Sequence, residues 1–147
     1  MESAELVPAN EHDFERMFAL HCLVFREHIA ELWGWDETWQ REDFRAKVSG
    51  SSCSLILHSG APVGYLQTTE ESGRIQLWNI AIHPLFQSRG IGQSVLKTLQ
   101  QVAAQRGLPL MLRVFPTNPR AQRFYERLGF SEVGRTRTGI EMAWRAA

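Results

Sequence analysis

The sequence predicts an α/β (α+β) fold in which helices pack on one mixed β-sheet. The first observation behind this prediction is the order of the apolar patterns, which run as β, α, α, β, β, β, α, β, α, β and β along 147 residues. The second is a pair of glycines, Gly90 and Gly92, where a strand passes into a helix. We expect a single domain, residues 1–147, because no repeat, linker or low-complexity tract divides the chain.

The N-terminal half contains a strand, two helices and a hairpin. The segment "AELVPA" is a short strand, and apolar residues recur at helical spacing after Asn10, a residue type that caps helix N-termini. A second, shorter helix follows from Asp36. The segments "SSCSLILHSG" and "APVGYLQTTEE" are strands joined by the turn "SGAP", and "IQLWNIAI" is a third long strand.

The C-terminal half begins with a helix from about Arg89 to Arg106, which Gly107 ends. Its predicted buried stripe consists of Ile91, Val95, Leu96, Leu99, Val102 and Ala103. The segment "LPLMLRVF" is short and apolar enough to be a central strand. Asn118 and Pro119 then fit the N-cap and the first position of another helix. The segment "FSEVGRTRTGIEMAW" closes the chain as a pair of strands.

The charge pattern narrows the possible partners. The formal net charge is zero, but residues 1–50 carry a net −6 and residues 51–147 a net +6. Either the acidic part meets a cation and the basic part an anion, or the protein is simply dipolar. The basic residues are scattered, so we expect no nucleic-acid partner. No long uncharged apolar run is present, so we expect no membrane span.

The two cysteines, Cys22 and Cys53, lie in unrelated contexts without metal-ligand spacing, so no metal site is predicted. Free cysteines fit a reducing compartment, and the first residues lack the pattern of a signal peptide. Together these observations predict a cytoplasmic protein.

The segment "HPLFQSRGIGQSVL", from His83 to Leu96, has the composition of an anion-binding turn. Gly90 and Gly92 remove side chains at the start of a helix, where backbone N–H groups lack partners and the helix dipole is positive. That combination binds phosphate or pyrophosphate. The spacing Q-x-x-G-x-G matches neither the dinucleotide fingerprint nor the P-loop. A tight strand-to-helix turn that binds nothing is the alternative interpretation.

The segment "NIAIHPLFQSRGIGQSVL", followed about thirty residues later by "NPRAQRFYERLGF", resembles the GCN5-related N-acetyltransferase (GNAT) superfamily. The first segment is similar to the family's acetyl-CoA motif, Q/R-x-x-G-x-G/A, and the second to its asparagine, tyrosine and "LGF" signature. The resemblance is specific over residues 75–130, and the element order extends it over the chain. It implies the GNAT fold, a mixed, mostly antiparallel central sheet with two splayed strands and about four flanking helices.

The resemblance assigns acetyl-CoA contacts residue by residue. Backbone amides from Gln87 to Gln93 would receive the pyrophosphate, and Ile80–Ile82 would offer main-chain groups to the pantetheine arm, which Asn118 would hold. Tyr125 would lie near the sulfur and protonate the leaving thiolate, a role that suits a phenol; a core tyrosine is the alternative. The implied cofactor-binding residues are Ile80, Ala81, Ile82, Gln87, Ser88, Arg89, Gly90, Ile91, Gly92, Gln93, Asn118 and Tyr125.

The resemblance also implies direct attack of an amine on the acetyl carbonyl, which requires a group to take a proton. Gln76 and Arg113 stand at positions where members of the family often carry a base, and neither can act as a carboxylate. Catalytic candidates besides Tyr125 therefore come from the acidic N-terminal part. They are Glu31 and His28, with an ordinary surface or packing role as the alternative for the histidine.

The segment "REHIAELWGWDETWQ" combines tryptophans with carboxylates. Trp33, Trp35 and Asp36 suit a cationic amine substrate through cation–π contact and ion pairing. Tryptophans that merely cap the core are the alternative. Asn79, in an otherwise apolar strand and on the face opposite Ile80, either orients a water or substrate or satisfies a bulge in the splayed strand.

These expectations combine into an N-acetyltransferase that moves the acetyl group of acetyl-CoA to a primary amine within a ternary complex, without a metal. The amine is expected to belong to a small molecule, with a protein or peptide amine as the second option. The resemblance also allows a homodimer through the C-terminal strands. The alternative from another class is an acetyl-CoA-binding sensor or regulatory module with little or no turnover. Gln76 and Arg113 favour that alternative, and Tyr125 opposes it.

Overall fold

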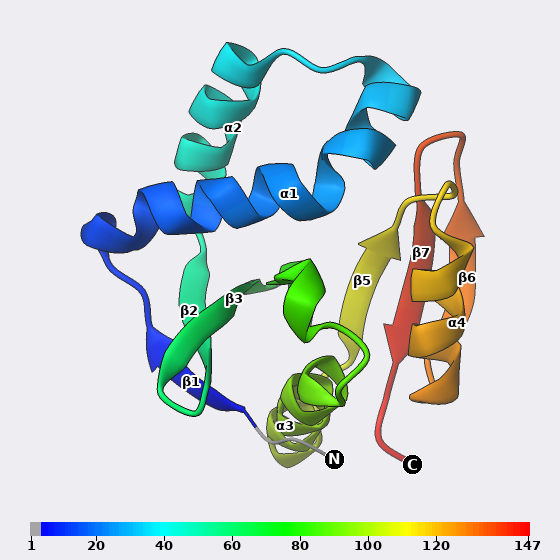
Figure 1. Cartoon of the computed structure of the whole chain (residues 1–147). Coiled ribbons are helices and arrows are strands. Elements are labelled where there is room, and N and C mark those ends of the chain that lie inside the picture. The colour runs from blue at the N-terminus through cyan, green and yellow to red at the C-terminus, as the bar shows by residue number, and fades with distance from the viewer. Residues whose placement is uncertain (1–3) are drawn as a thin grey trace.

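A seven-stranded sheet organises the computed structural model, which describes residues 4–147 (Figure 1). Residues 1–3, the start of the predicted domain, lie outside the described residues. The strands are β1 (Glu5–Pro8), β2 (Ser52–His58), β3 (Ala61–Glu71), β4 (Arg74–Ile82), β5 (Leu110–Val114), β6 (Ser131–Arg135) and β7 (Ile140–Trp144). Their order is β1-β2-β3-β4-β5-β7-β6, with β4 and β5 parallel and the other neighbours antiparallel. The predicted mixed, mostly antiparallel sheet is confirmed.

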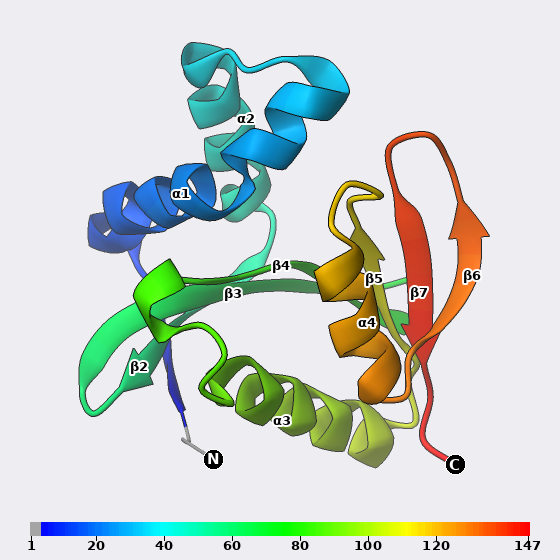
Figure 2. The same ribbon diagram turned by 45° about the vertical axis from the view of Figure 1, so that its right-hand side comes forward.

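Helices cover both faces of this sheet. They are α1 (Phe14–Trp33), α2 (Glu37–Ser49), α3 (Ile91–Arg106) and α4 (Pro119–Arg127), with short 3₁₀ turns at Glu11–Asp13 and Pro84–Phe86. Figure 2 shows α1 and α2 over one face of β3 and β4, α3 under the other face, and α4 beside β5 and β7. No helix within residues 4–147 is long and apolar enough to cross a bilayer.

Side-chain caps set the starts of three of these segments, as the sequence predicts. Asn10 Oδ1 accepts from the His12 N–H at 2.9 Å, but the first residues after it form the 3₁₀ turn, and α1 begins only at Phe14. Asp36 caps α2, and Asn118 Oδ1 accepts from the Ala121 N–H at 3.1 Å to cap α4. Each cap satisfies a backbone donor that has no partner within its own helix.

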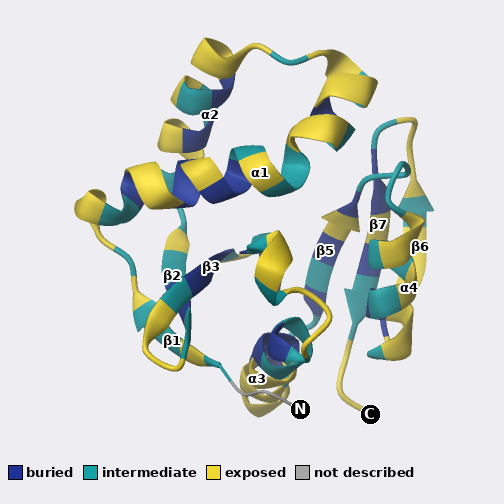
Figure 3. Ribbon diagram, viewed as in Figure 1, coloured by how far each residue is buried: buried dark blue, intermediate teal, exposed yellow. Residues whose placement is uncertain are grey.

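Two apolar clusters lie on opposite faces of the sheet (Figure 3). The larger cluster joins β2–β5 and β7 to α3 and α4, and the smaller one joins α1 and α2 to β2–β4. Val102 is a correction to the predicted stripe of α3, because its side chain is 38% exposed while Leu99 and Ala103 are buried. It lies at the border of the apolar face, where a helical spacing alone does not decide burial.

A β-bulge at Trp78 changes which side chains of β4 face each helical layer. Asn79 pairs with Gln67 of β3 and Leu77 with Thr68, so Trp78 is the additional residue. Strict alternation would place the side chains of Leu77 and Ile80 on opposite faces of the sheet. Both nevertheless pack in the larger cluster, because the bulge adds a residue between them. The bulge therefore directs the side chains of both Trp78 and Asn79 to the face of the sheet that α1 and α2 cover.

The parallel strands β4 and β5 separate after a short paired stretch. Their register runs from Ile75↔Leu110 to Leu77↔Leu112, after which β4 continues to Ile82. The rest of β4 pairs with β3 on its other side. The splayed pair that the resemblance implies is thus present, and it opens toward α1 and α2.

Candidate active site

A cavity of about 660 Å³ lies between the α1–α2 layer and the open part of the β4–β5 pair. Residues from α1, α2, β3, β4, β5, α4 and the β6–β7 connection line it. Most of its wall is apolar or aromatic, and a few polar side chains converge on it, as in small-molecule sites. Its aromatic residues are Phe25, Trp33, Trp39, Phe44, Trp78, Phe115 and Tyr125.

The glycine turn before α3 has the geometry of an anion site. Gly90 is the N-cap of α3 in the left-handed conformation, with φ 86°, and Ser88 also has a positive φ of 63°. The Ser94 N–H donates to the Gly90 carbonyl at 3.0 Å, which is the first bond of the helical ladder. The N–H groups of Ile91–Gln93 precede that bond, so the helix itself does not satisfy them. A phosphate group fits such a site.

Two arginines lie beside this turn. Arg120, from α4, donates through Nη2 to Ser88 Oγ, and the Arg89 guanidinium lies 5.2 Å from the centre of the Phe86 ring. These cations add to the positive potential of the helix terminus. The turn therefore combines backbone donors with positive charge, the combination that a pyrophosphate requires.

The segment Ile80–Ile82 leads from the cavity to the glycine turn. It lies beyond Leu77↔Leu112, the last β4–β5 pair, so the edge that faces β5 is open to an added extended chain. Gln87 Nε2 donates to the Ile82 carbonyl at 2.8 Å and ties the turn to the end of β4. The cavity, this open edge and the turn thus follow one another along the chain.

Tyr125 and Asn118 both line the cavity from the β5–α4 side. Tyr125 is buried, with ring contacts to Phe124 at 5.2 Å and Phe130 at 5.6 Å between centroids. Burial raises the pKa of the Tyr125 phenol above its ordinary value, so at neutral pH the hydroxyl is a proton donor. Asn118 uses its Oδ1 for the α4 cap, which leaves its amide N–H groups for a ligand.

Three half-exposed tryptophans lie around the cavity. Trp33 is 56% exposed, Trp39 57% and Trp78 48%, and they come from α1, α2 and β4. Trp35 is placed differently: it is not among the lining residues, and its indole Nε1 is buried without a hydrogen-bond partner. Asp36 lines the cavity and also caps α2 through the Trp39 N–H at 3.1 Å.

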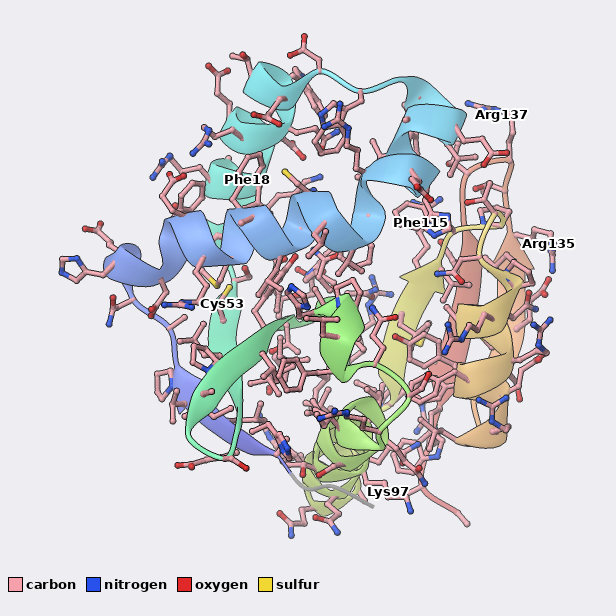
Figure 4. All side chains as sticks on the ribbon, in the orientation of Figure 1. Phe18, Cys53, Lys97, Phe115, Arg135 and Arg137 are labelled. Atoms are coloured by element: carbon pink, nitrogen blue, oxygen red, sulfur yellow. The ribbon has the colours of Figure 1, made fainter. Side chains whose placement is uncertain are left out.

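The two N-terminal candidates for a base lie outside the cavity wall. His28 Nδ1 is 2.7 Å from Thr117 Oγ1, and its ring stacks on Phe115 at 5.4 Å, so it packs against the end of β5. Figure 4 labels Phe115 at this place, beside the last turns of α1. Glu31 is exposed and is not among the lining residues. The structure brings neither side chain to Tyr125.

Gln76 and Arg113 flank a second, smaller hollow of about 170 Å³, which adjoins the main cavity and shares Trp78, Leu112 and Arg113 with it. Glu141 of β7 pairs with Arg113 across the sheet and lines this hollow rather than the main cavity. Arg113 reaches both hollows and donates through Nη2 to Thr136 Oγ1 at 3.1 Å. Glu141 is therefore not among the residues that line the cavity with Tyr125.

Several polar residues of the cavity wall escaped the sequence analysis. Gln67 of β3 is 2% exposed and bonds Asn79, and Asp43 of α2 forms an ion pair with Lys47 at 2.9 Å. A glutamine inside the apolar run "VGYLQ" is a signal of the same kind as Asn79 in "LWNIAI". The α2 residues gave no such signal, because charged residues on a surface helix are ordinary.

His21 is a buried histidine of the cavity wall. Its Nε2 is 3.3 Å from Gln40 Oε1, its ring stacks on Phe44 at 4.8 Å, and its Nδ1 is buried without a partner. Burial lowers the pKa of His21, and the bond with Gln40 offsets part of that effect. The imidazole is thus neutral in the folded protein at neutral pH.

The buried imidazole predicts a loss of stability in mild acid. The unfolded state takes up this proton near pH 6.5, so the free energy of unfolding falls as pH drops below about 6.5. His21→Phe should flatten this dependence by at most about 1.4 kcal/mol per pH unit. Urea unfolding between about pH 7 and pH 5 measures it. The exposed His12→Gln variant should keep the original slope, and equal slopes in both variants would contradict the prediction.

Comparison with known proteins agrees with this geometry. The model of the acetyltransferase (GNAT) family matches residues 14–130. The chain belongs to this family. The resemblance seen in the glycine turn and the "LGF" segment is therefore confirmed, and the protein is a GNAT-type acyl-CoA N-acyltransferase with acetyl-CoA as co-substrate.

Known GNAT proteins are similar over nearly the whole chain. The [ribosomal protein bS18]-alanine N-acetyltransferase of Haemophilus ducreyi is 27% identical over 136 residues, which cover 84% of this chain and 79% of that protein. The PaiA N-acetyltransferase of Thermoplasma acidophilum, solved in complex with coenzyme A, superposes with a TM-score of 0.81 over 97% of this chain and 99% of its own, at 15% identity. An acetyltransferase of Thermus thermophilus superposes with a TM-score of 0.77 over 99% of this chain and 100% of its own, at 22% sequence identity.

The described residues of this GNAT fit the acyl donor and offer no metal centre. Within residues 4–147 no three His, Cys, Asp or Glu side chains gather in a way that would hold a metal ion. The glycine turn, the open edge of β4 and the cavity follow one another in the order of the pyrophosphate, the pantetheine arm and the thioester. We take the cavity end of this path as the candidate active site.

Proposed function

We propose that this GNAT transfers the acetyl group of acetyl-CoA directly to a primary amine of a small molecule bound in the cavity. The observation that carries the proposal is the cavity itself, which Tyr125, Asn118 and Asn79 line at the point where β4 and β5 separate. Amine and thioester would both reach this point, so a ternary complex suffices and no acyl-enzyme is needed.

The chain's own residues would bind the donor along one path. Backbone N–H groups of Gln87–Gln93 hold the pyrophosphate, with Arg120 and Arg89 adding positive charge nearby. Main-chain groups of Ile80–Ile82 pair with the pantetheine arm as an added strand would, and the Asn118 amide donates to it. Acetyl-CoA supplies an activated acyl group with a thiolate leaving group.

Proton transfer at the sulfur falls to Tyr125. In the net reaction the amine nitrogen forms the C–N bond, the C–S bond breaks with its electrons on sulfur, and one proton leaves nitrogen. The Tyr125 hydroxyl is protonated at neutral pH, as a phenol ordinarily is, and can donate to the sulfur as negative charge develops there. The proton from nitrogen leaves to solvent in the cavity, and solvent returns a proton to the Tyr125 oxygen, so amine and thioester become amide and thiol with Tyr125 restored.

The acceptor end of the cavity favours a small molecule over an extended chain. A volume of about 660 Å³ is the usual size of a small-molecule site. Arg137, in the β6–β7 connection, donates to the Leu32 carbonyl at the end of α1 at 3.4 Å. Figure 4 labels Arg137 beside that end of α1. This bond joins the segments that carry Thr138 and Trp33, two lining residues, so a polypeptide crossing the site would have to displace it.

Two other functions compete with this one. The relative from Haemophilus ducreyi is named for an alanine of ribosomal protein bS18, so the amino terminus of a protein is a second candidate acceptor. A chain end could enter the cavity without crossing it. A sensor that binds acetyl-CoA without turnover is the third candidate, and Gln76 and Arg113 are the residues that favour it.

Calorimetric titration and an amine panel separate these functions. Acetyl-CoA and CoA should bind, and ATP should not, because it lacks the pantetheine arm. Release of free thiol is then followed with spermidine, tryptamine, free amino acids and a peptide that begins with alanine. Turnover of a small amine is the expected result. Turnover of the peptide alone would show that the acceptor is the amino terminus of a polypeptide rather than a small molecule. Binding without any turnover would leave the sensor, and no binding of acetyl-CoA would overturn all three.

A further inference from the structure

A chain of side-chain hydrogen bonds, which passes through the buried Gln67, connects the candidate active site to the end of α2. Asn79 Nδ2 donates to Gln67 Oε1 at 2.8 Å, and Gln67 Nε2 donates to Ser51 Oγ at 3.0 Å. The Ser51 hydroxyl in turn donates to the Lys47 carbonyl at 2.8 Å. Gln67 is 2% exposed, so water does not compete for its amide. The chain runs from a cavity residue to a backbone group.

The backbone carbonyl fixes the direction of every bond in this chain. A carbonyl oxygen can only accept, so the single hydroxyl proton of Ser51 points to the backbone carbonyls of Lys47 at 2.8 Å and Val48 at 3.3 Å. The Ser51 oxygen must then accept, which turns the NH₂ group of Gln67 toward it. The carbonyl of Gln67 therefore faces Asn79 and requires the NH₂ group of Asn79. The side-chain oxygen of Asn79, Oδ1, accepts no bond in this chain and is the acceptor available to a ligand in the cavity.

The bulge in β4 places this oxygen at the mouth of the splayed pair. Asn79 lines the cavity and lies two residues after Leu77↔Leu112, the last β4–β5 pair. It directly precedes Ile80, the first residue of the edge proposed for the pantetheine arm. Asn118 and Tyr125 line the same cavity from the opposite strand side. An acceptor oxygen thus lies beside the proposed position of the thioester.

An amine nucleophile needs such an acceptor. The nitrogen must be neutral, and its lone pair must point at the acetyl carbonyl. A hydrogen bond from one N–H to a fixed oxygen turns the lone pair in a defined direction. A side chain that presented an amide N–H there would instead compete for that lone pair. The orientation of the Asn79 amide therefore decides whether the residue helps or hinders attack.

We propose that Asn79 Oδ1 accepts an N–H of the acceptor amine and that Gln67 and Ser51 are positioning residues that keep the oxygen turned to the cavity. This inference rests on the proposed function and names a further part of the same site. Asn79 stays neutral throughout and takes no proton. The acceptor class it selects is an amine with at least one N–H free to donate, which a tertiary amine lacks.

Four variants test the proposal with the panel amine that has the highest kcat/KM. Asn79→Ala should lower kcat/KM for the amine by about tenfold to a hundredfold, because one polar contact to the nucleophile is lost. Ser51→Ala, which does not touch the cavity, should lower it by about threefold to tenfold, because the chain loses its fixed direction. Asn79→Asp should keep most of the activity, since a carboxylate offers acceptor oxygens only and the Gln67 amide can turn its NH₂ group toward it. Its pH profile should gain an acidic limb as the carboxyl becomes protonated.

The decisive measurement is a double-mutant cycle. Ser51→Ala should cost activity in the original chain and nothing further in the Asn79→Asp background, because a carboxylate has no wrong orientation to adopt. A merely structural serine would cost the same in both. Ser49→Ala is the matched control, since Ser49 Oγ donates to the Arg45 carbonyl at 3.0 Å at the same end of α2 without reaching Gln67. This control should keep wild-type kcat/KM.

The outcomes separate this inference from the proposed function. The acetyl-CoA dissociation constant should stay within about twofold of wild type in all variants. Wild-type kcat/KM in Asn79→Ala, or equal costs of Ser51→Ala in both backgrounds, would overturn the inference alone. If the unsubstituted protein turned over no amine, the proposed function would fail and the inference with it. Slow exchange of the Gln67 side-chain NH₂ protons by NMR, accelerated in Ser51→Ala, is the expected independent sign of the fixed chain.

Discussion

Tyr125→Phe is expected to lower kcat for acetyl transfer by about a hundredfold or more, the range for loss of a general acid. The fold should persist, because the phenyl ring keeps its contacts with Phe124 and Phe130 and no helix cap is touched. Acetyl-CoA binding should also persist, since pyrophosphate and pantetheine contacts lie elsewhere. The loss therefore belongs in kcat rather than in KM for acetyl-CoA. Steady-state kinetics and calorimetry of the same preparation measure both.

The second tyrosine of the chain is a matched control for this prediction. Tyr65 lies in the smaller apolar cluster, is fully buried, and its hydroxyl has no hydrogen-bond partner. Tyr65→Phe removes an unsatisfied buried hydroxyl, so it should leave activity unchanged and stability equal or higher. If Tyr125→Phe keeps full kcat on a true acceptor, Tyr125 is a packing residue and the proton reaches the thiolate by another route.

Local rules were enough for most of the fold. A helix cap is an interaction between residues close in sequence. The starts of three helical segments can therefore be predicted from the cap residues Asn10, Asp36 and Asn118. The alternation of strand and helix patterns likewise predicts the layers. Val102 shows the limit of such rules, because it lies at the border of the apolar face of α3, where helical spacing alone does not decide burial.

The site depends on longer-range geometry that a linear pattern does not carry. The bulge at Trp78 turns two consecutive residues toward α1 and α2, and no residue type in "IQLWNIAI" demands it. Trp35 and Trp33 differ by two positions, yet Trp33 lines the cavity and Trp35 does not, because the chain bends at Gly34 with φ 85°. Residue types in this region predict an aromatic site, but which rings form it follows from that bend.

The candidate bases illustrate the same limit. His28 and Glu31 are close in sequence to the tryptophans, but the helical period sends them away from the cavity, His28 to Thr117 and Glu31 to solvent. Positions on α1 that do line the cavity include His21 and Phe25, four residues apart on one face. Tertiary packing decides which face of α1 meets the splayed strands. That packing places the neutral His21, rather than a carboxylate, on the α1 side of the cavity.

Gly92→Glu is expected to weaken acetyl-CoA binding by about a hundredfold while the fold is retained. Gly92 is the second residue of α3, and a Cβ there would lie 3.4 Å from Ile82 Cδ1 and 3.5 Å from Phe124 Cζ, in ordinary contact. The longer glutamate must extend past these neighbours into the turn, where its carboxylate would take the place of a phosphate oxygen. A carboxylate in the first turn is favourable for the helix itself, so stability should not fall.

Two glycine variants separate the charge from the position. Gly92→Ala adds only the tolerated Cβ, so its acetyl-CoA affinity should stay within about fivefold of wild type and its helix should be slightly more stable. Gly50→Glu makes the same charge change at the end of α2, where φ is −97° and a Cβ would lie 3.9 Å from the Lys47 carbonyl oxygen, in ordinary contact, and it should leave binding unchanged. Calorimetric titration measures all three. If Gly92→Glu binds acetyl-CoA as wild type does, the phosphates lie away from α3, and the glycines serve only to turn the chain from β4 into the helix.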